Sequence, residues 1–452
     1  MSIAAELGRF ASEFPVGDVP PKTMEYAAML ISSTVASAAL GSTQESSRLV
    51  RSLEMERGGA SQATAWFHGG PKLPIAAAAR INALMSDAAA SDDSDLRNIV
   101  HPGTTLAATS LAVGEKTGAT GEEVLAAIVL GFDVASRING AVIPGLREKG
   151  FHGCVIAAFG GAVAAARLMK LDAARLTQAI ALIATSMGGI MAAANTSTAR
   201  EWHAGLAAML AVNAAQAAAI GYTAEAEIFE HDRGFLYVFG QQPDAGKVQA
   251  VTAGLGDRWE ILHEMAIKLV PGGHPYHAIA EAAAKASREN EIRPEDVEAI
   301  LISQVGVRRL SGPRHPSDLI GVAHSPRYFA AAGIVDRDFS WAHATDAKIN
   351  DPAIRSLFDK VEIGPQPTEE VERYKQGATV TVRLRGGRSV AGTVFAPRGS
   401  ASRGVEWPDV EAKYRALLPF AGLPEQAIKQ SADVIRSFRV VRNLSEFLGL
   451  LK

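Results

Sequence analysis

Apolar positions in residues 1–265 recur mostly in long segments of helical length, and several of these segments are rich in alanine and glycine. The clearest examples are residues 155–169, 178–194 and 204–220. Because small side chains let helices approach closely, this pattern predicts a tightly packed helical body.

Local signals predict where some of these helices begin and end. Pro102 suits the first turn of a helix, and Gly118 suits its end. Thr120 and Glu123 have the spacing of a capping box, and Asp172 can cap the helix that runs through Ala184. Residues 102–184 are therefore expected to hold consecutive helices.

The pattern changes after residue 265. Residues 297–307 carry Ile, Leu and Val at the density of a strand, and residues 379–385 alternate strictly. Gly386 and Gly387 then lead into a second strand over residues 388–395, which predicts a hairpin. Helical segments at residues 278–288 and 328–335 make this a mixed α+β region.

Helical pattern returns from Trp407 to Leu451. We therefore predict a mainly α protein, in which a smaller α+β domain is inserted before C-terminal helices that rejoin a large all-helical domain. The expected bounds are 1–265 for the first part of the helical domain, 266–402 for the α+β domain and 403–452 for the returning helices.

Composition narrows the class of protein. The 452 residues carry a net charge of −3 and no long basic run, which argues against a nucleic-acid partner. The start of the chain lacks the pattern of a signal peptide, and the Ala-rich segments indicate buried helices rather than membrane spans. We expect a cytoplasmic protein with no membrane partner.

Cysteine and histidine usage limits the possible cofactors. Cys154 is the single cysteine, which excludes an internal disulfide and a cysteine-ligated iron–sulfur cluster. His274 and His277 stand close together, but no cysteine or carboxylate follows at ligand spacing, so we expect no metal. Motifs for nucleotide binding and for a serine nucleophile are absent from the sequence, and no cofactor is expected.

Two histidines stand where helices are predicted to begin. His152 precedes the apolar run that starts at Val155, and His101 precedes Pro102. The positive end of a helix disfavours an imidazolium, so each ring should be neutral and able to move a proton near pH 7. A purely structural role for each histidine stays an alternative. The acidic segment before His101, residues 86–95, is expected to lie outside the core.

Other polar residues are weaker candidates. Arg200 and His203 have the spacing of neighbours on one helix face, although a surface ion pair would also explain Arg200. Lys268 lies between apolar residues before a Pro-Gly-Gly loop, where burial would lower its pKa, unless its amine reaches solvent. Tyr328 begins a predicted helix and could donate to a substrate oxygen or be structural.

The order of these short motifs resembles the MmgE/PrpD family over nearly the whole chain. The motifs are His101-Pro102-Gly103 after an Asp-rich loop, Gly150-Phe151-His152, Arg200-Glu201-Trp202-His203-Ala204-Gly205, Asp232-Arg233-Gly234-Phe235, Lys268-Leu269-Val270-Pro271 with His277, and Ser325-Pro326-Arg327-Tyr328.

The resemblance implies a helical domain with an α+β lid, a homodimer and an active site without an iron–sulfur cluster. A lysine is common in the family where Arg200 stands, and arginine keeps the charge but cannot act as a base. The implied catalytic residues are His101, His152, Lys268 and Tyr328, and the implied substrate-binding residues are Asp92, Asp93, Arg200, His203 and His277.

Members of the family labilise a proton or a carboxylate next to a carboxylate-bearing carbon. The resemblance therefore implies a cofactor-independent enzyme acting on a small di- or tricarboxylate, with cations holding the carboxylates and histidines moving the proton. Dehydration of a 2-methylcitrate-like acid ranks first, epimerisation of an iminodisuccinate-like acid second and cis-aconitate-type decarboxylation third. A non-catalytic homologue that binds carboxylates is the alternative from another class.

Overall fold

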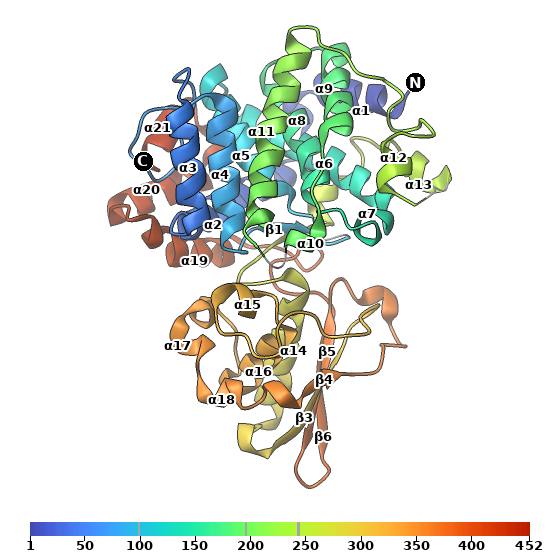
Figure 1. Ribbon diagram of the computed structural model, residues 1–452, viewed down its shortest axis with the longest axis vertical. Helices are drawn as coiled ribbons and strands as arrows, with labels where there is room; N and C mark the ends of the chain where they lie inside the picture. Colours follow the sequence, from blue (N-terminus) through green and yellow to red (C-terminus); the bar gives the residue numbers. More distant parts are fainter. Residues whose placement is uncertain (98–99, 195–196, 242–244) are drawn as a thin grey trace. The chain divides into compact units, whose positions relative to one another are not determined.

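The computed structural model describes residues 1–97, 100–194, 197–241 and 245–452, which form two compact units (Figure 1). Unit 1 comprises Met1–Ile267 and Val410–Lys452, and unit 2 comprises Lys268–Asp409. The protein is mainly helical, as predicted. Unit 2 begins two residues later and ends seven residues later than the 266–402 segment expected from the sequence.

Unit 1 consists of packed helices and one short two-stranded sheet. The sheet, which the sequence did not predict, pairs β1 (Asp93–Asp95) with β2 (Met265–Ile267) in antiparallel order. The helices are α1 (Ile3–Glu13), α2 (Pro21–Gly41), α3 (Glu45–Arg57), α4 (Ile75–Ala88), α5 (Pro102–Thr117), α6 (Gly121–Val142), α7 (Gly145–Glu148), α8 (Cys154–Leu168), α9 (Ala173–Ser186), α10 (Met191–Ala194), α11 (Ala199–Ala219), α12 (Phe235–Phe239), α13 (Ala245–Ala250), α20 (Glu425–Arg436) and α21 (Leu444–Gly449).

The Ala-rich helix α8 lies at the centre of unit 1, packed against α5, α6 and α11. Every residue of α8 except Arg167 is buried. Helices α6 and α8 approach so closely that a methyl group at Gly131 would lie 2.6 Å from the carbonyl oxygen of Gly160. The small residues therefore set the short distance between these helices, as the sequence pattern predicted.

Several predicted helix ends are confirmed. Thr120 and Glu123 form the capping box of α6, and the Asp172 side chain accepts a hydrogen bond from the backbone of Arg175 at the start of α9. Gly118 ends α5 with a positive φ of 70°, which glycine adopts without strain.

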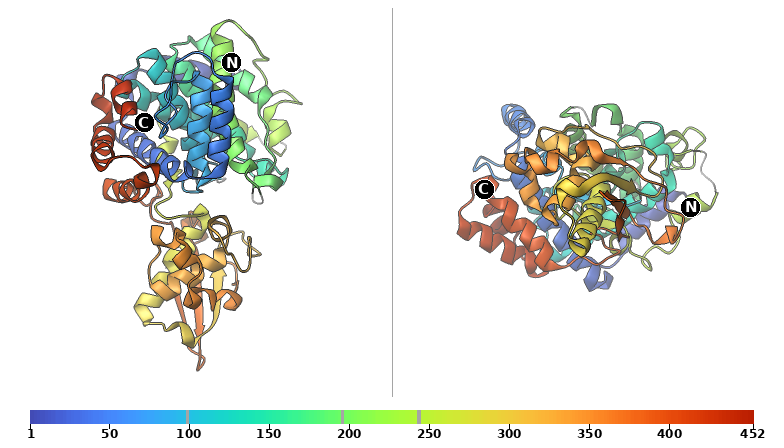
Figure 2. Two further views of the ribbon diagram at one scale, coloured as in Figure 1. Left: turned by 60° about the vertical axis from the view of Figure 1, so that its left-hand side comes forward. Right: turned by 90° about the horizontal axis from the view of Figure 1, so that it is seen from below.

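The C-terminal helices rejoin unit 1. Helix α20 packs on α2 and α21 packs on α5, and both views in Figure 2 show this red segment beside the blue N-terminal helices. Helix α19 (Trp407–Leu417) contains the boundary between the units. One described helix, α6, is long and apolar enough to span a membrane, but 94% of its apolar window is buried inside the protein.

Unit 2 is built on a four-stranded sheet in the order β4-β3-β5-β6. Strand β3 runs parallel to β4 and antiparallel to β5, and the predicted hairpin is formed by β5 and β6, with Arg383 opposite Ser389. The elements are α14 (His274–Asn290), β3 (Val297–Ser303), α15 (Leu319–Ala323), α16 (Pro326–Asp336), α17 (Asp346–Ile349), α18 (Pro352–Arg355), β4 (Val361–Ile363), β5 (Ala378–Leu384) and β6 (Ser389–Val394).

Helix α14 packs on β5 and β6, and α16 packs on α14, so one core joins the helices to the sheet. Strand residues such as Val380 and Val382 alternate into this core, which explains the strict alternation of the sequence. The mixed α+β character predicted for this region is confirmed.

Candidate active site

The acidic segment before His101 is buried, so the prediction that residues 86–95 lie outside the core was wrong. Its carboxylates tolerate burial because donors surround them. Asp93 accepts hydrogen bonds from the backbone N–H groups of Gly103 (2.8 Å) and Thr104 (3.3 Å) at the start of α5. The carboxylate thus stabilises the positive end of that helix.

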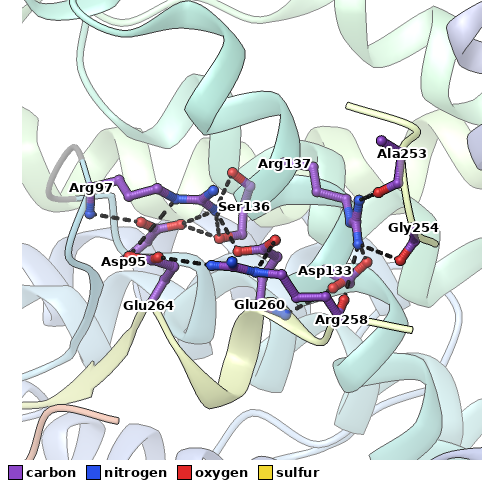
Figure 3. A network of polar contacts seen from close by, with 10 residues as sticks. All are labelled: Asp95, Arg97, Asp133, Ser136, Arg137, Ala253, Gly254, Arg258, Glu260 and Glu264. Atoms are coloured by element: carbon purple, nitrogen blue, oxygen red, sulfur yellow. Dashed lines mark hydrogen bonds and ion pairs between the residues drawn. The ribbon is translucent and has the colours of Figure 1, made fainter. Parts of the chain in front are cut away.

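A network of charged side chains fixes the next residues of the segment (Figure 3). The Asp95 carboxylate accepts hydrogen bonds from the backbone of Arg97 (3.0 Å) and from the Ser136 hydroxyl. The Arg97 guanidinium also lies 3.4 Å from a carboxylate oxygen of Glu260. Because these groups come from β1, α6 and the turn before β2, the network holds the strand in one place.

A second part of the network lies along α6. Arg137 donates to Asp133 (2.6 Å) and to the carbonyl oxygen of Ala253 (2.6 Å), as Figure 3 shows. Burial raises the pKa of Asp133 to about 6, although Arg137 opposes that effect. The backbone N–H of Glu260 donates to the other oxygen of Asp133 (2.9 Å), which links the turn before β2 to α6.

The C-terminal part of unit 1 also holds the acidic segment. The carbonyl oxygen of Ser91 accepts hydrogen bonds from the Ser37 hydroxyl (2.8 Å) and from the buried Lys413 amine. Lys413 donates to the Ser33 hydroxyl as well (2.7 Å). The position of Asp92 is therefore set by α2 and α19, together with the segment's own strand.

His101 is the N-cap residue of α5, at the helix start that the sequence predicted. Its Nδ1 contacts the carbonyl oxygen of Asp93 and lies 3.2 Å from a carboxylate oxygen of Asp92. Both groups are acceptors, so this arrangement favours the tautomer with the proton on Nδ1 and the lone pair on Nε2.

His152 is buried at the start of α8, with a relative exposure of 7%. Its backbone N–H donates to Gly189 (3.0 Å), and its Nδ1 accepts from the backbone N–H of Cys154 (3.4 Å). Burial lowers the pKa of His152 to about 3, with further lowering by His101, His203 and Arg200. The ring is therefore neutral, as predicted, and burial is the largest cause.

Arg200 lies in the first turn of α11 and is buried, so the alternative of a surface ion pair does not describe it. Its Nε lies 3.1 Å from the Asp87 carboxylate, and its terminal nitrogen donates to the carbonyl oxygens of Asp87 (2.7 Å) and Ala88 (3.2 Å). Burial disfavours the charge, but Asp87, Glu201 and Asp92 together raise the pKa of Arg200. The cation is held permanently in the interior.

His203 follows one turn after Arg200, and its ring centre lies 5.2 Å from that of His152. Burial lowers the pKa of His203. Unit 1 thus brings together His101, His152 and Arg200, which stand in three separate motifs of the sequence. The predicted residues in this cluster are Asp92, Asp93, His101, His152, Arg200 and His203.

The other three predicted residues belong to unit 2. Lys268 is buried and directly follows β2, whose last residue pairs with Asp93. His277 is buried in the first turn of α14, where its ring stacks on Phe329 with 6.0 Å between ring centres.

Tyr328 has the surroundings of a structural tyrosine. It lies in the apolar core of unit 2, and its hydroxyl donates to the carbonyl oxygen of His343 (2.8 Å). Burial raises the pKa of Tyr328 above its usual value. This arrangement favours the structural alternative over the predicted role as a proton donor.

Two residues that hold the cluster carried no recognisable signal in the sequence. Asp87 anchors Arg200 across 113 positions of the chain, and Lys413 anchors Ser91 across 322 positions. Neither stands in a motif, and the pairing depends on the tertiary fold. A cavity of about 310 Å³ lined by Thr117, Arg167 and neighbouring residues contains none of the predicted site residues.

Comparison with known proteins identifies the family. The chain matches the MmgE/PrpD N-terminal domain over residues 5–247 and the MmgE/PrpD C-terminal domain over residues 271–436. The chain belongs to the MmgE/PrpD family. The resemblance drawn from the short motifs is thereby confirmed.

Three curated relatives match over at least 89% of their own lengths. Cis-aconitate decarboxylase of Aspergillus terreus strain NIH 2624 is 27% identical over 479 residues, which is 99% of this chain and 96% of the relative. Human cis-aconitate decarboxylase is 23% identical, covering 95% of this chain and 89% of the relative. The cis-aconitate decarboxylase-like protein oryM of Aspergillus oryzae is 23% identical, covering 100% and 97%.

Proposed function

We propose that this MmgE/PrpD protein is a cofactor-independent lyase that acts on a small di- or tricarboxylate by moving a proton next to a carboxylate. The observation that carries the proposal is the cluster in unit 1. It combines two histidines, His101 and His152, with the buried cation of Arg200 and with carboxylates that orient them. Such a set can bind an anion and move a proton without a cofactor.

The two histidines suit different tasks. With its proton on Nδ1, His101 presents the Nε2 lone pair, which can take a proton from carbon or, once protonated, return it. His152 accepts at Nδ1, so its neutral ring carries the proton on Nε2 and can donate a hydrogen bond to a substrate oxygen. A neutral donor of this kind stabilises charge that develops on the oxygen of an enolate.

The relatives favour decarboxylation among the three reactions considered from the sequence. Two relatives of that name each cover at least 95% of this chain. In such a reaction the bond from carbon to one carboxylate breaks, carbon dioxide leaves, and the electron pair moves through the adjacent alkene to a carbon that takes a proton. In our proposal His101 first takes a proton from solvent at Nε2 and then gives it to that carbon. Arg200 contributes positive potential that favours the dianionic or trianionic substrate.

The predicted roles of the residues in unit 2 rest on the family motifs alone. Lys268 stays a predicted catalytic residue and His277 a predicted substrate-binding residue, both based on the family motifs. Tyr328 is given no part in the proton transfer, because its hydroxyl donates a hydrogen bond to the backbone carbonyl oxygen of His343. A homodimer and a cytoplasmic location also stay predictions, and light scattering on the purified full chain would measure the first.

Proton NMR in D2O tests the proposal. The full chain, freed of metals with a chelator, is mixed with cis-aconitate, trans-aconitate, citrate, 2-methylcitrate, malate and iminodisuccinate in turn. We expect a new alkene product and release of carbon dioxide from cis-aconitate. His101→Gln should slow turnover by about 10²–10⁴-fold, the usual contribution of a positioned acid or base. His152→Gln should slow it by about 10²–10³-fold, the usual effect of losing a donor to a developing oxyanion. His231→Gln, at an exposed histidine, is the matched control.

The other outcomes would contradict parts of the proposal. Loss of water from a hydroxy acid without carbon dioxide would show dehydration, and deuterium exchange without net loss would show epimerisation, the second-ranked reaction. Either result would replace decarboxylation while keeping a proton-transfer enzyme. Binding of every compound without turnover would contradict the enzyme and support the carboxylate-binding homologue.

A further inference from the structure

Three side chains, two of which belong to the proposed catalytic cluster, have the identity and spacing of metal ligands. His152, Cys154 and His203 each present a ring nitrogen or a sulfur, and these atoms all lie within 4.8 Å of one another. Within residues 1–97, 100–194, 197–241 and 245–452, no other group of three such side chains meets this spacing. His203 lies 51 positions after His152, so the spacing is not that of a local sequence motif.

Two further observations point to a ligand at this position. The Nδ1 atom of His203 is buried and has no hydrogen-bond partner among the described residues, although buried ring nitrogens are normally paired. The backbone of Gly189 also faces the group. A methyl group there would lie 2.9 Å from the Cys154 sulfur and 3.5 Å from the His203 ring, and φ is 153°. Glycine therefore keeps open the space next to two of the three donors.

We propose that His152, Cys154 and His203 form a binding site for a borderline or soft divalent cation, with Zn²⁺ as the best match. Two imidazoles and one thiolate are zinc ligands, whereas magnesium and calcium prefer oxygen. In tetrahedral zinc sites the ligand atoms lie roughly 3.5 Å apart. Small side-chain movements would thus close the group around the ion, with a fourth position left for water or a carboxylate.

Binding exchanges a proton for the metal. In the structure the Cys154 sulfur lies 3.7 Å from the carbonyl oxygen of Gly188, to which its S–H donates. When the zinc–sulfur bond forms, the S–H bond breaks and the proton passes to the buffer. The Asp87 carboxylate contributes negative potential at both Cys154 and His203, which favours a cation there. The ion pair of Asp87 with Arg200 offsets the repulsion between that arginine and the ion.

Zinc at this site would also inhibit the proposed reaction, because it would occupy His152. This consequence rests on the proposed function, whereas the binding itself does not. The site would then limit the enzyme to conditions in which free zinc is scarce.

Direct metal titration of the purified, metal-stripped full chain tests the site. We expect one equivalent of Zn²⁺ to bind, measured by competition with a chromophoric chelator, and no competition from excess Mg²⁺. Bound Co²⁺ should show the near-ultraviolet charge-transfer absorption of a cobalt–thiolate bond. Cys154→Ser and His203→Ala should each weaken Zn²⁺ binding at least tenfold, and His231→Ala should bind as the unmodified chain does.

Circular dichroism and thermal melting of each variant separate loss of ligands from loss of fold. For folded variants, unchanged zinc affinity after both substitutions would overturn the site, as would bound cobalt without the thiolate absorption. If Cys154→Ser does not fold, the cobalt spectrum of the unmodified chain still decides whether the thiol is a ligand. Because no substrate is present, the result does not depend on whether the protein is a decarboxylase.

Discussion

Burial of the neutral His152 ring should make folding stability depend on pH in a measurable way. The pKa of this ring is 6.5 in the unfolded chain and about 3 in the folded protein. As the pH falls, the unfolded state therefore takes up the proton first, and stability is lost between pH 6.5 and about 3. The full effect is about 5 kcal/mol, of which about 2 kcal/mol falls between pH 7 and pH 5.

Urea unfolding of the unmodified protein and of His152→Gln at pH 7 and pH 5 measures this contribution. Other groups also titrate, including His68, whose pKa is lowered to about 4 by burial and by Arg51. Their effects are common to both proteins and cancel in the comparison. We expect the free-energy advantage of the unmodified protein over the variant to shrink by about 2 kcal/mol from pH 7 to pH 5.

The exposed His231 provides the control, since His231→Gln should leave the pH dependence of unfolding unchanged. A difference between the unmodified protein and His152→Gln that stays constant from pH 7 to pH 5 would refute the reasoning. It would mean that the His152 ring can be protonated in the folded protein. The argument that His152 serves as a neutral hydrogen-bond donor in the proposed reaction would then fail.

Three substitutions test the structural supports. Asp87→Asn removes the carboxylate that lies 3.1 Å from the buried Arg200. It should lower the free energy of unfolding by about 3 kcal/mol, measured as a lower melting temperature. An unchanged melting temperature would mean that the ion pair does not stabilise the fold. Thr120→Ala removes the capping box and should cost about 1 kcal/mol in urea unfolding, and no shift in midpoint would contradict the assigned cap. Gly131→Ala should lower the free energy of unfolding by about 1–3 kcal/mol, because the added methyl group pushes α6 away from α8. Gly17→Ala is the control and should not lower it, because the space around Gly17 is open. Equal effects of the two substitutions would argue against close packing of these helices.

Much of the fold follows from local signals. Thr120, Asp172 and Gly118 act within a few residues of their helix ends, so the sequence alone predicts those ends. The alternation of residues 379–385 likewise identifies a strand with one face against helices. The two-stranded sheet in unit 1 was missed because three-residue strands have too little pattern to stand out.

The site was predictable only in part. His101 and His152 stand at helix starts, which are visible in the sequence. The burial of Asp93 is not visible, because a run of acidic and small polar residues normally lies in solvent. Its donors are backbone groups of α5 that become available only when the tertiary structure forms.

The long-range support of Ser91 by Lys413 has a consequence for the order in which the chain folds. These residues are separated by 322 positions, and all of unit 2 is synthesised between them. At about 5–20 residues per second, Lys413 emerges roughly 15–60 s after Ser91. Unit 2 is continuous in sequence, so all of its residues are available once Asp409 has been synthesised. The acidic segment of unit 1 gains its hydrogen bond from Lys413 only after that. The unit that begins first is thus completed last, and its candidate site gains the Lys413 support only when synthesis is nearly finished.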